Sequence, residues 1–108
     1  MTDGKSGPGR VIGDLSIYPI GEGTSLGKYV REAYTAMETV PGVRLSPGAM
    51  STVIEADSLA TVFRAVETAH AALLRLHARR IAIILRIDHR LDKAETIEYK
   101  VGRIKGEL

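Results

Sequence analysis

The chain has 108 residues, of which 44% are hydrophobic and 26% are charged. These proportions are typical of a globular domain, and the length fits one domain with a single hydrophobic core. Fifteen basic side chains are nearly balanced by thirteen acidic ones, so the net charge of +2 is a weak argument for a nucleic-acid partner. Cysteine is absent, which excludes disulfides and thiolate chemistry.

No apolar run approaches the roughly 18 residues that a membrane-spanning helix needs. The first ten residues, MTDGKSGPGR, are polar and rich in glycine, and they lack the apolar region of a secretory signal. We therefore expect residues 1–10 to form a flexible tail and residues 11–108 to form a single domain. We also expect a cytoplasmic protein.

The first half of the domain is predicted to contain a strand and a helix. Side chains alternate in character over residues 11–20, VIGDLSIYPI, which predicts the strand. Thr24 and Ser25 are the candidate N-caps of the helix, and Pro41-Gly42 ends it. Its apolar stripe recurs at helical spacing through Leu26, Val30, Ala33, Met37 and Val40.

Two short strands follow, over residues 43–46 (VRLS) and 50–56 (MSTVIEA), because both are rich in β-branched or alternating apolar residues. Asp57 or Ser58 then caps a second helix. The apolar stripe of this helix is Leu59, Val62, Val66, Ala69, Leu73 and Leu76.

The last strand is predicted over residues 80–88, RIAIILRID, and a C-terminal helix over residues 97–108. The element order β-α-β-β-α-β predicts a ferredoxin-like α+β fold with a four-stranded antiparallel sheet. Both long helices cover one face of that sheet, and the C-terminal helix docks separately. The expected sheet contribution to the core is Leu15, Ile17, Ile81, Ile83, Leu85 and Ile87.

The other face of the predicted sheet mixes apolar and polar side chains. It carries Ile12, Asp14, Ser16 and Tyr18 from the first strand and Ala82, Ile84, Arg86 and Asp88 from the last. The third strand contributes either Met50, Thr52 and Ile54 or Ser51, Val53 and Glu55. Such a face favours packing between subunits with a ligand between their sheets; the alternative is a half-solvated antiparallel face.

Three blocks of sequence carry a resemblance to a known family. DLSIYPIGEGTSLGKYV (14–30), MSTVIEAD (50–57) and RIDHRLDK (86–93) resemble the small thiamine-binding protein family, whose members are ferredoxin-like and cytoplasmic. The resemblance implies homodimers that form through their sheets and often pair into tetramers. It also implies binding of thiamine, or its aminopyrimidine half, without reaction. The family often has glycine where Ser51 and Ala56 stand here, and the added Cβ atoms would narrow a site.

A thiamine site needs a carboxylate, hydroxyl groups and a flat or soft apolar surface. Glu55 is the first candidate, because it would accept from the pyrimidine amine or meet the thiazolium cation. The alternative is a salt bridge from Glu55 to Arg86 or Arg90.

Four further residues complete the predicted ligand site. Ser16 and Thr52 would orient the ring by hydrogen bonds, unless they form a plain cross-strand polar pair. Tyr18 would stack on the ligand or else pack at the subunit interface. Met50 would supply an adaptable apolar wall or else belong to the core.

Asp88 and Arg90 follow the last strand and are expected at a subunit interface or at the rim of the site. The alternative is that they are solvated or paired with neighbouring charges. An arginine-rich stretch over residues 75–90 is compatible with phosphate binding. However, Tyr18 is the clear aromatic candidate on the sheet face, which makes nucleic acid an unlikely partner.

No nucleophile elbow, catalytic triad or convincing carboxylate pair can be assembled from the sequence. His70 and His77 lack a third ligand, so we expect no metal and no cofactor. The sequence therefore predicts a non-catalytic small-molecule binding protein, acting as a carrier, buffer or sensor. The alternative is a regulatory or structural homo-oligomer that binds another metabolite.

Overall fold

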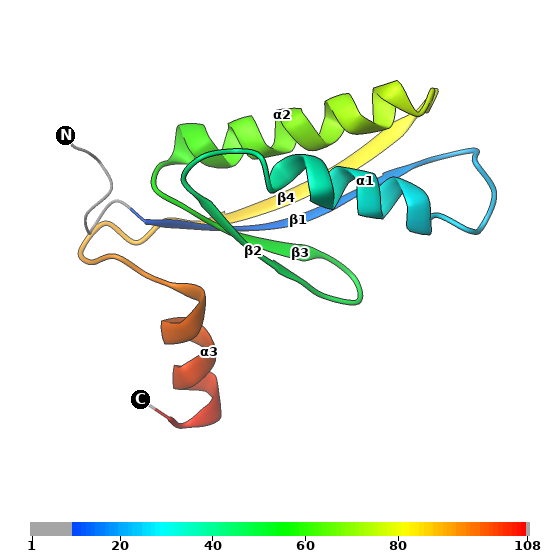
Figure 1. Cartoon of the computed structure of the whole chain (residues 1–108). Helices are drawn as coiled ribbons and strands as arrows, with labels where there is room; N and C mark the ends of the chain where they lie inside the picture. Colours follow the sequence, from blue (N-terminus) through cyan, green and yellow to red (C-terminus); the bar gives the residue numbers. More distant parts are fainter. Residues whose placement is uncertain (1–9, 108) are drawn as a thin grey trace.

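The structure is a computed structural model and describes residues 10–107. Its four strands form one antiparallel sheet in the order β2-β3-β1-β4. The helices α1 and α2 cover one face of this sheet (Figure 1), which confirms the ferredoxin-like α+β prediction. Of the predicted tail, only Arg10 lies within the described residues. The elements are β1 (Val11–Pro19), α1 (Gly27–Met37), β2 (Val43–Pro47), β3 (Thr52–Ala56), α2 (Leu59–Arg75), β4 (Ile81–Asp88) and α3 (Ile97–Lys105).

The register decides which side of the sheet each residue of β3 faces. Glu55 lies opposite Ile12 of β1, and directly opposed residues of antiparallel strands share a face. Glu55 and Val53 therefore face away from the helices, whereas Thr52 and Ile54 face them. The strand also begins later than predicted, at Thr52, because residues 48–51 form a turn closed by the Gly48 N–H and the Ser51 carbonyl.

The hydrophobic core lies between the sheet and the two covering helices, and it differs from the prediction on α1, on β4 and at the start of α2, where Leu59 is 38% exposed. Tyr29 is buried in place of Val30, which is 48% exposed. The Tyr29 hydroxyl donates to Glu22, which allows the ring to be buried with its polar end satisfied. Ile83 and Ile87 are 42% and 38% exposed, because β4 is an edge strand and α2 packs mainly over β1 and β3.

One predicted helix cap is confirmed and the other is wrong. Ser58 caps α2, since its hydroxyl accepts from the Thr61 N–H at 3.2 Å. Thr24 and Ser25 do not cap α1: the helix begins at Gly27, its N-cap is Leu26, and no side chain caps it. The two hydroxyl residues thus stand before the cap position, where they cannot reach the free N–H groups of the first turn.

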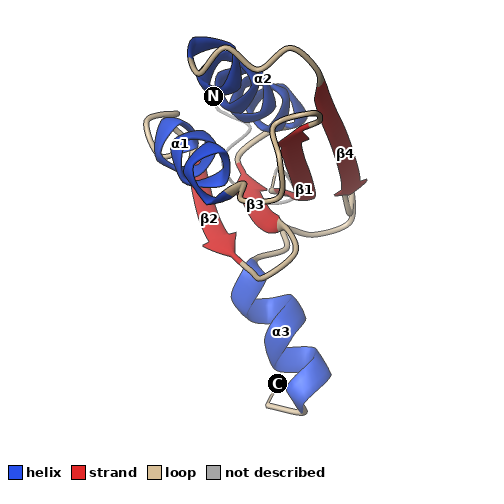
Figure 2. Cartoon of the chain, turned by 90° about the vertical axis from the view of Figure 1, so that its right-hand side faces the viewer, coloured by secondary structure: helices blue, strands red, loops and turns tan. Residues whose placement is uncertain are grey.

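The C-terminal helix α3 leaves the body of the domain instead of joining the core. Figure 2 shows it extending beyond the end of the sheet. Thr96 caps its start by accepting from the Tyr99 N–H, and Gly106 ends it in the left-handed conformation (φ 75°). Ile104 is 86% exposed. Within residues 10–107, no helix combines the length and apolar character required to cross a membrane.

The cap assignment can be tested with a matched pair of serine variants. Ser58→Ala is expected to lower the free energy of unfolding by about 1 kcal/mol, because it removes an N-cap hydrogen bond. Ser25→Ala removes no such bond and should change stability by less than about 0.5 kcal/mol. Urea unfolding followed by circular dichroism measures both. Equal losses in the two variants would contradict the assignment.

Candidate functional site

A cleft opens beside the central strand, at the point where β3 stops pairing with it. β3 accompanies β1 only as far as Leu15, whereas β4 accompanies it to Pro19. The cleft has a volume of about 120 Å³. Its walls come from β1 (residues 15–18), from α1 (Val30, Ala33, Tyr34 and Met37) and from the β2–β3 turn (residues 48–52).

The face of the sheet that is turned away from α1 and α2 is called the open face. Side chains on this face hold the β2–β3 turn against β1. The Ser16 hydroxyl donates to the Met50 carbonyl at 2.9 Å, and the Ser51 hydroxyl donates to Asp14 at 2.6 Å. Arg86 donates to the second carboxylate oxygen of Asp14 at 2.9 Å. The Ser51 hydrogen bond, followed by that of Arg86, lowers the pKa of Asp14 below its ordinary value. The turn is thereby anchored without extending the strand ladder into the cleft.

Four of the five predicted ligand residues line this cleft: Ser16, Tyr18, Met50 and Thr52. Two alternative interpretations of them are wrong. Ser16 and Thr52 are not a cross-strand pair, because Ser16 lies opposite Ile84, and Thr52 opposite Leu15 on the other face. Met50 does not belong to the core, since it is 88% exposed.

The helix α1 contributes to the cleft, which the sequence pattern did not predict. Val30 was assigned to the core, yet it lines the cleft together with Tyr34, one helical turn further on. The spacing of these two residues at i and i+4 was a usable signal for a shared surface. It was hidden because Val30 also fits the apolar stripe of the core.

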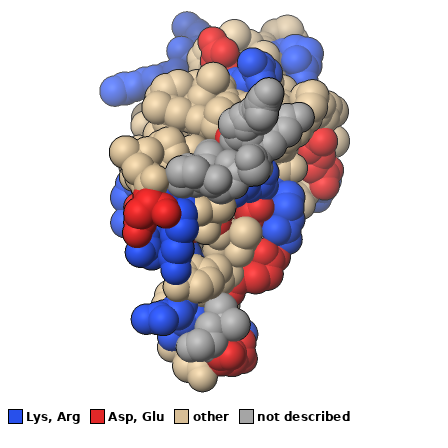
Figure 3. All heavy atoms as spheres, turned by 90° about the vertical axis from the view of Figure 1, so that its left-hand side faces the viewer, with Lys and Arg blue, Asp and Glu red and all other residues tan. Residues whose placement is uncertain are grey.

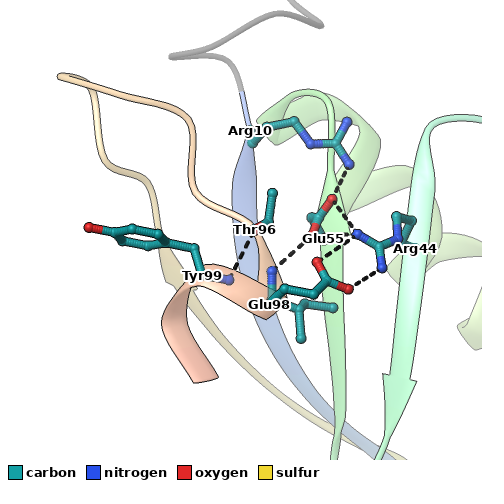
Figure 4. A network of polar contacts seen from close by, with 7 residues as sticks. Arg10, Arg44, Glu55, Thr96, Glu98 and Tyr99 are labelled. Carbon is teal, nitrogen blue, oxygen red and sulfur yellow. Dashed lines mark hydrogen bonds and ion pairs between the residues drawn. The ribbon is translucent and has the colours of Figure 1, made fainter. Parts of the chain in front are cut away.

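Glu55, the fifth predicted ligand residue, lies outside the cleft. It is 2% exposed and holds together segments from distant parts of the chain, as Figure 4 shows. Its carboxylate accepts from Arg10 at 2.5 Å, from Arg44 at 3.3 Å and from the Ile97 N–H at 2.9 Å. A buried carboxylate needs such partners, because desolvation of an unpaired charge is strongly unfavourable.

The predicted salt-bridge partners of Glu55 are wrong. The register places Arg44 of β2 directly opposite Glu55, whereas Arg86 lies opposite Asp14 and pairs with it. Arg90 forms a local ion pair with Asp92 at 2.6 Å. The correct partner of Glu55 depends on strand order and register, which a single sequence does not display.

Two residues near the start of α3, Glu98 and Lys100, form ion pairs that attach this helix to the sheet. Arg44 bridges from Glu55 to Glu98, and Lys100 donates to Asp88 at 2.6 Å. The Arg44 hydrogen bonds lower the pKa of Glu98 to about 2, and Lys100 lowers the pKa of Asp88. Between α3 and the open face lies a wider hollow of about 420 Å³, lined by Ile12, Asp14, Arg86, Ile87, Asp88 and Lys100.

The charged side chains form no field of one sign on the face shown in Figure 3, where basic and acidic groups alternate from α2 down to α3. Among the described residues visible in this view, no continuous basic track is offered to a phosphate backbone. Among residues 10–107, no three His, Asp or Glu side chains come together in an arrangement that would hold a metal ion.

Comparison with known proteins identifies the family. A family model described as thiamine-binding protein matches residues 13–105. The chain belongs to the thiamine-binding protein family. It is a small binding protein of this family, as the three sequence blocks predicted. A UPF0045 protein of Methanocaldococcus jannaschii is 37% identical over 99 residues, covering 92% of this chain and 95% of that protein. A UPF0045 protein of Synechocystis is 35% identical over 96 residues, covering 89% and 78%.

Solved structures of similar proteins share the fold. The crystal structure of the Methanocaldococcus jannaschii protein matches with a TM-score of 0.81 and 35% identity, covering 93% of this chain and 99% of that chain. A Thermotoga maritima protein, for which a role in thiamine biosynthesis or salvage has been suggested, matches with a TM-score of 0.72 and 23% identity, covering 88% and 98%. The latter similarity establishes the fold alone.

Removing the charge of Glu55 should loosen α3. Glu55→Gln keeps an acceptor for the Ile97 N–H but removes the ion pairs with Arg10 and Arg44. We expect a loss of about 2 kcal/mol in the free energy of unfolding. The loss is limited to this size because both arginines are partly exposed, so water can solvate their guanidinium groups once the ion pairs are gone. Amide exchange in α3 should accelerate more than in α2. Unchanged exchange in α3 would contradict this role.

Acid should release α3 through Glu98. Its pKa is about 2 in the folded protein, below the ordinary value of 4.5. The pairing with Arg44 therefore stabilises the docked helix fully above pH 4.5, and this contribution is lost as the pH falls from 4.5 to 2. Amide chemical shifts of α3 should report the change. Glu98→Gln should show loosened α3 signals already at pH 7; a pH course identical to that of the unmodified protein would refute the assignment.

Proposed function

We propose that the protein binds thiamine, or its aminopyrimidine half, without reaction, and that the pyrimidine ring occupies the cleft beside β1. The observation that carries the proposal is the size and lining of this cleft in a chain of the thiamine-binding protein family. A volume of about 120 Å³ is close to the roughly 150 Å³ cavity that admits benzene. The cleft thus has room for one six-membered ring, and the thiazolium half remains outside it.

The lining suits a flat ring with polar substituents. Ala33 and Met37 supply a buried apolar wall, and Tyr18 and Tyr34 supply aromatic side chains near the mouth. Thr52 adds a hydroxyl group to this wall. Pockets for small molecules generally combine such an apolar lining with a few orienting polar groups. We therefore keep Tyr18 and Thr52, with Ser16 and Met50, as the proposed ligand contacts.

Glu55 has a different place in this proposal. Its carboxylate is enclosed by Arg10, Arg44 and the start of α3, and it does not line the cleft. Within the described part of the chain, the walls of the cleft contain no carboxylate, imidazole or amine. The side chains of the lining that could exchange a proton most readily are the Tyr18 and Tyr34 phenols, and no carboxylate or imidazole of the described residues stands beside them in the lining as a partner for general acid–base chemistry. This lining favours binding without catalysis.

A second copy of the chain is proposed to cover the mouth of the cleft. Ser16 and Tyr18 reach the cleft from the open face, where Tyr18 is 36% and Ile84 57% exposed. Packing of two open faces would bury these apolar side chains. We propose a homodimer of this kind, which pairs again into a tetramer, with Asp88 and Arg90 at its rim. The lack of cysteine is in keeping with a cytoplasmic protein.

A second candidate function rests on the charged hollow between α3 and the open face. Its volume of about 420 Å³ and its side chains Asp14, Arg86, Asp88 and Lys100 suit a charged metabolite better than a single ring. A regulatory or structural homo-oligomer that binds such a metabolite is therefore the alternative to a thiamine-binding role.

A pair of helix variants tests the cleft. Val30→Phe should narrow it from α1 and weaken the binding of 4-amino-5-hydroxymethyl-2-methylpyrimidine at least tenfold, since Val30 lines the cleft and is 48% exposed. Leu74→Phe is the matched control, because Leu74 is 52% exposed on α2 and lies outside the cleft. Its affinity should stay within twofold of the unmodified protein. Titration calorimetry measures all three proteins.

Thermal unfolding with thiamine provides the independent readout. A ligand that binds only the folded state raises the melting temperature, with a stabilisation that grows as RT ln(1+[L]/Kd). No rise with either thiamine or the aminopyrimidine at millimolar concentration would overturn the proposal. A rise with another charged metabolite, and with neither thiamine nor the aminopyrimidine, would favour the charged hollow instead.

A further inference from the structure

The central strand has a free edge inside the cleft. On one side, β1 pairs with β4 from Ile12 to Pro19 without interruption. On the other side, its pairing with β3 ends at Leu15, opposite Thr52. Beyond Leu15 the chain of β1 continues as a strand, and among residues 10–107 no strand pairs with its main-chain groups on that side.

The register identifies which main-chain groups face this side. The Ile20 N–H donates to the Arg80 carbonyl at 2.8 Å, which continues the β1–β4 register by one step. In an antiparallel ladder, residues alternate between bonding to one neighbour strand and to the other. Even-numbered residues of β1 therefore bond towards β4, and the N–H and carbonyl of Ile17 point towards the cleft. Pro19 agrees with this parity, because proline in a strand must place its nitrogen on an unpaired side.

The β2–β3 turn does not satisfy these groups. Ser16 and Ser51 attach it through side-chain hydrogen bonds to the Met50 carbonyl and to Asp14. Throughout residues 10–107, no hydrogen bond joins the main chain of Ile17 to the turn. Moreover, all of residues 15–18 line the cleft although their side chains alternate between faces. That pattern arises where a cleft runs along the edge of a strand.

We infer that the Ile17 main chain is the recognition element for an aromatic ring that carries an amine next to a ring nitrogen. Such a ring presents one donor and one acceptor on one edge. A residue of β3 opposite Ile17 would present the same two groups if the pairing continued beyond Leu15. The amine donates to the Ile17 carbonyl, and the ring nitrogen accepts from the Ile17 N–H. This inference rests on the proposed function and adds to it the main-chain atoms that determine which ligand binds.

The surroundings make this contact selective. Ala33 and Met37 are 1% and 2% exposed and line the cleft, so its inner wall is apolar. In such a setting, a ring that leaves the Ile17 groups unpaired loses affinity, because an unsatisfied buried polar group is unfavourable. A ring without the amine should therefore be rejected although its shape is almost the same.

The experiment uses two rings of matched shape and the amide signals of the full chain. 4-Amino-2,5-dimethylpyrimidine carries the amine, and 2,4,5-trimethylpyrimidine has a methyl group in its place. Calorimetry should show at least tenfold weaker binding of the second ring. In ¹⁵N NMR, the Ile17 amide should exchange rapidly in the free protein, and the first ring should slow that exchange and shift the signal. The Tyr18 amide is the matched control, because it bonds towards β4 and should be protected throughout.

The outcomes separate the two proposals. If the amino ring binds without changing the signal or the exchange rate of the Ile17 amide, this inference is overturned and the proposed function stands. The same conclusion follows if the Ile17 amide is already protected from exchange before any ligand is added. Equal affinity for both rings overturns it in the same way. If neither the rings nor thiamine bind, the proposed function itself fails.

Discussion

The unequal pairing of the central strand shapes the whole molecule. β1 is hydrogen-bonded to β4 along its length but to β3 only as far as Leu15, so the sheet has four strands at one end and a gap at the other. The gap is bounded on one side by α1 and on another by the β2–β3 turn, which Ser16 and Ser51 hold in place. A continuous four-stranded sheet would have filled this space with main chain. The cleft therefore exists because one strand stops early.

The two ends of the sheet differ in the polarity of their side chains. At the end where all four strands are present, Glu55 is buried beneath Arg10, Arg44 and the first turn of α3, which secures the C-terminal helix. At the other end, the described residues that line the cleft are apolar or hydroxyl-bearing, and none of them is charged. This separation is physically reasonable, because a buried carboxylate needs several donors, whereas a neutral ring needs an apolar wall with few polar groups.

Most of the fold, and part of the residue set around the cleft, could be predicted from the sequence. The periodicities predicted every strand and helix in the right order, and Ser58 was a correct cap because its hydroxyl directly precedes the helix. Ser16, Tyr18, Met50 and Thr52, which the sequence groups as ligand contacts, line one cleft, and their contact with a ligand stays a prediction. Glu55 was set among them because an acidic residue in an apolar strand is a strong signal. That signal shows that the carboxylate must be paired, and it does not show with what.

Local features of the sequence therefore determined the elements, since strand alternation, helical spacing and capping depend on residues close together in the chain. Tertiary structure decided the rest. The register chose Arg44 over Arg86 as the partner of Glu55, set Thr52 and Glu55 on opposite faces, and left Ile83 half exposed at an edge. Each of these outcomes depends on which strand lies beside which and where its pairing ends, and neither property is written in the order of residues along a single strand.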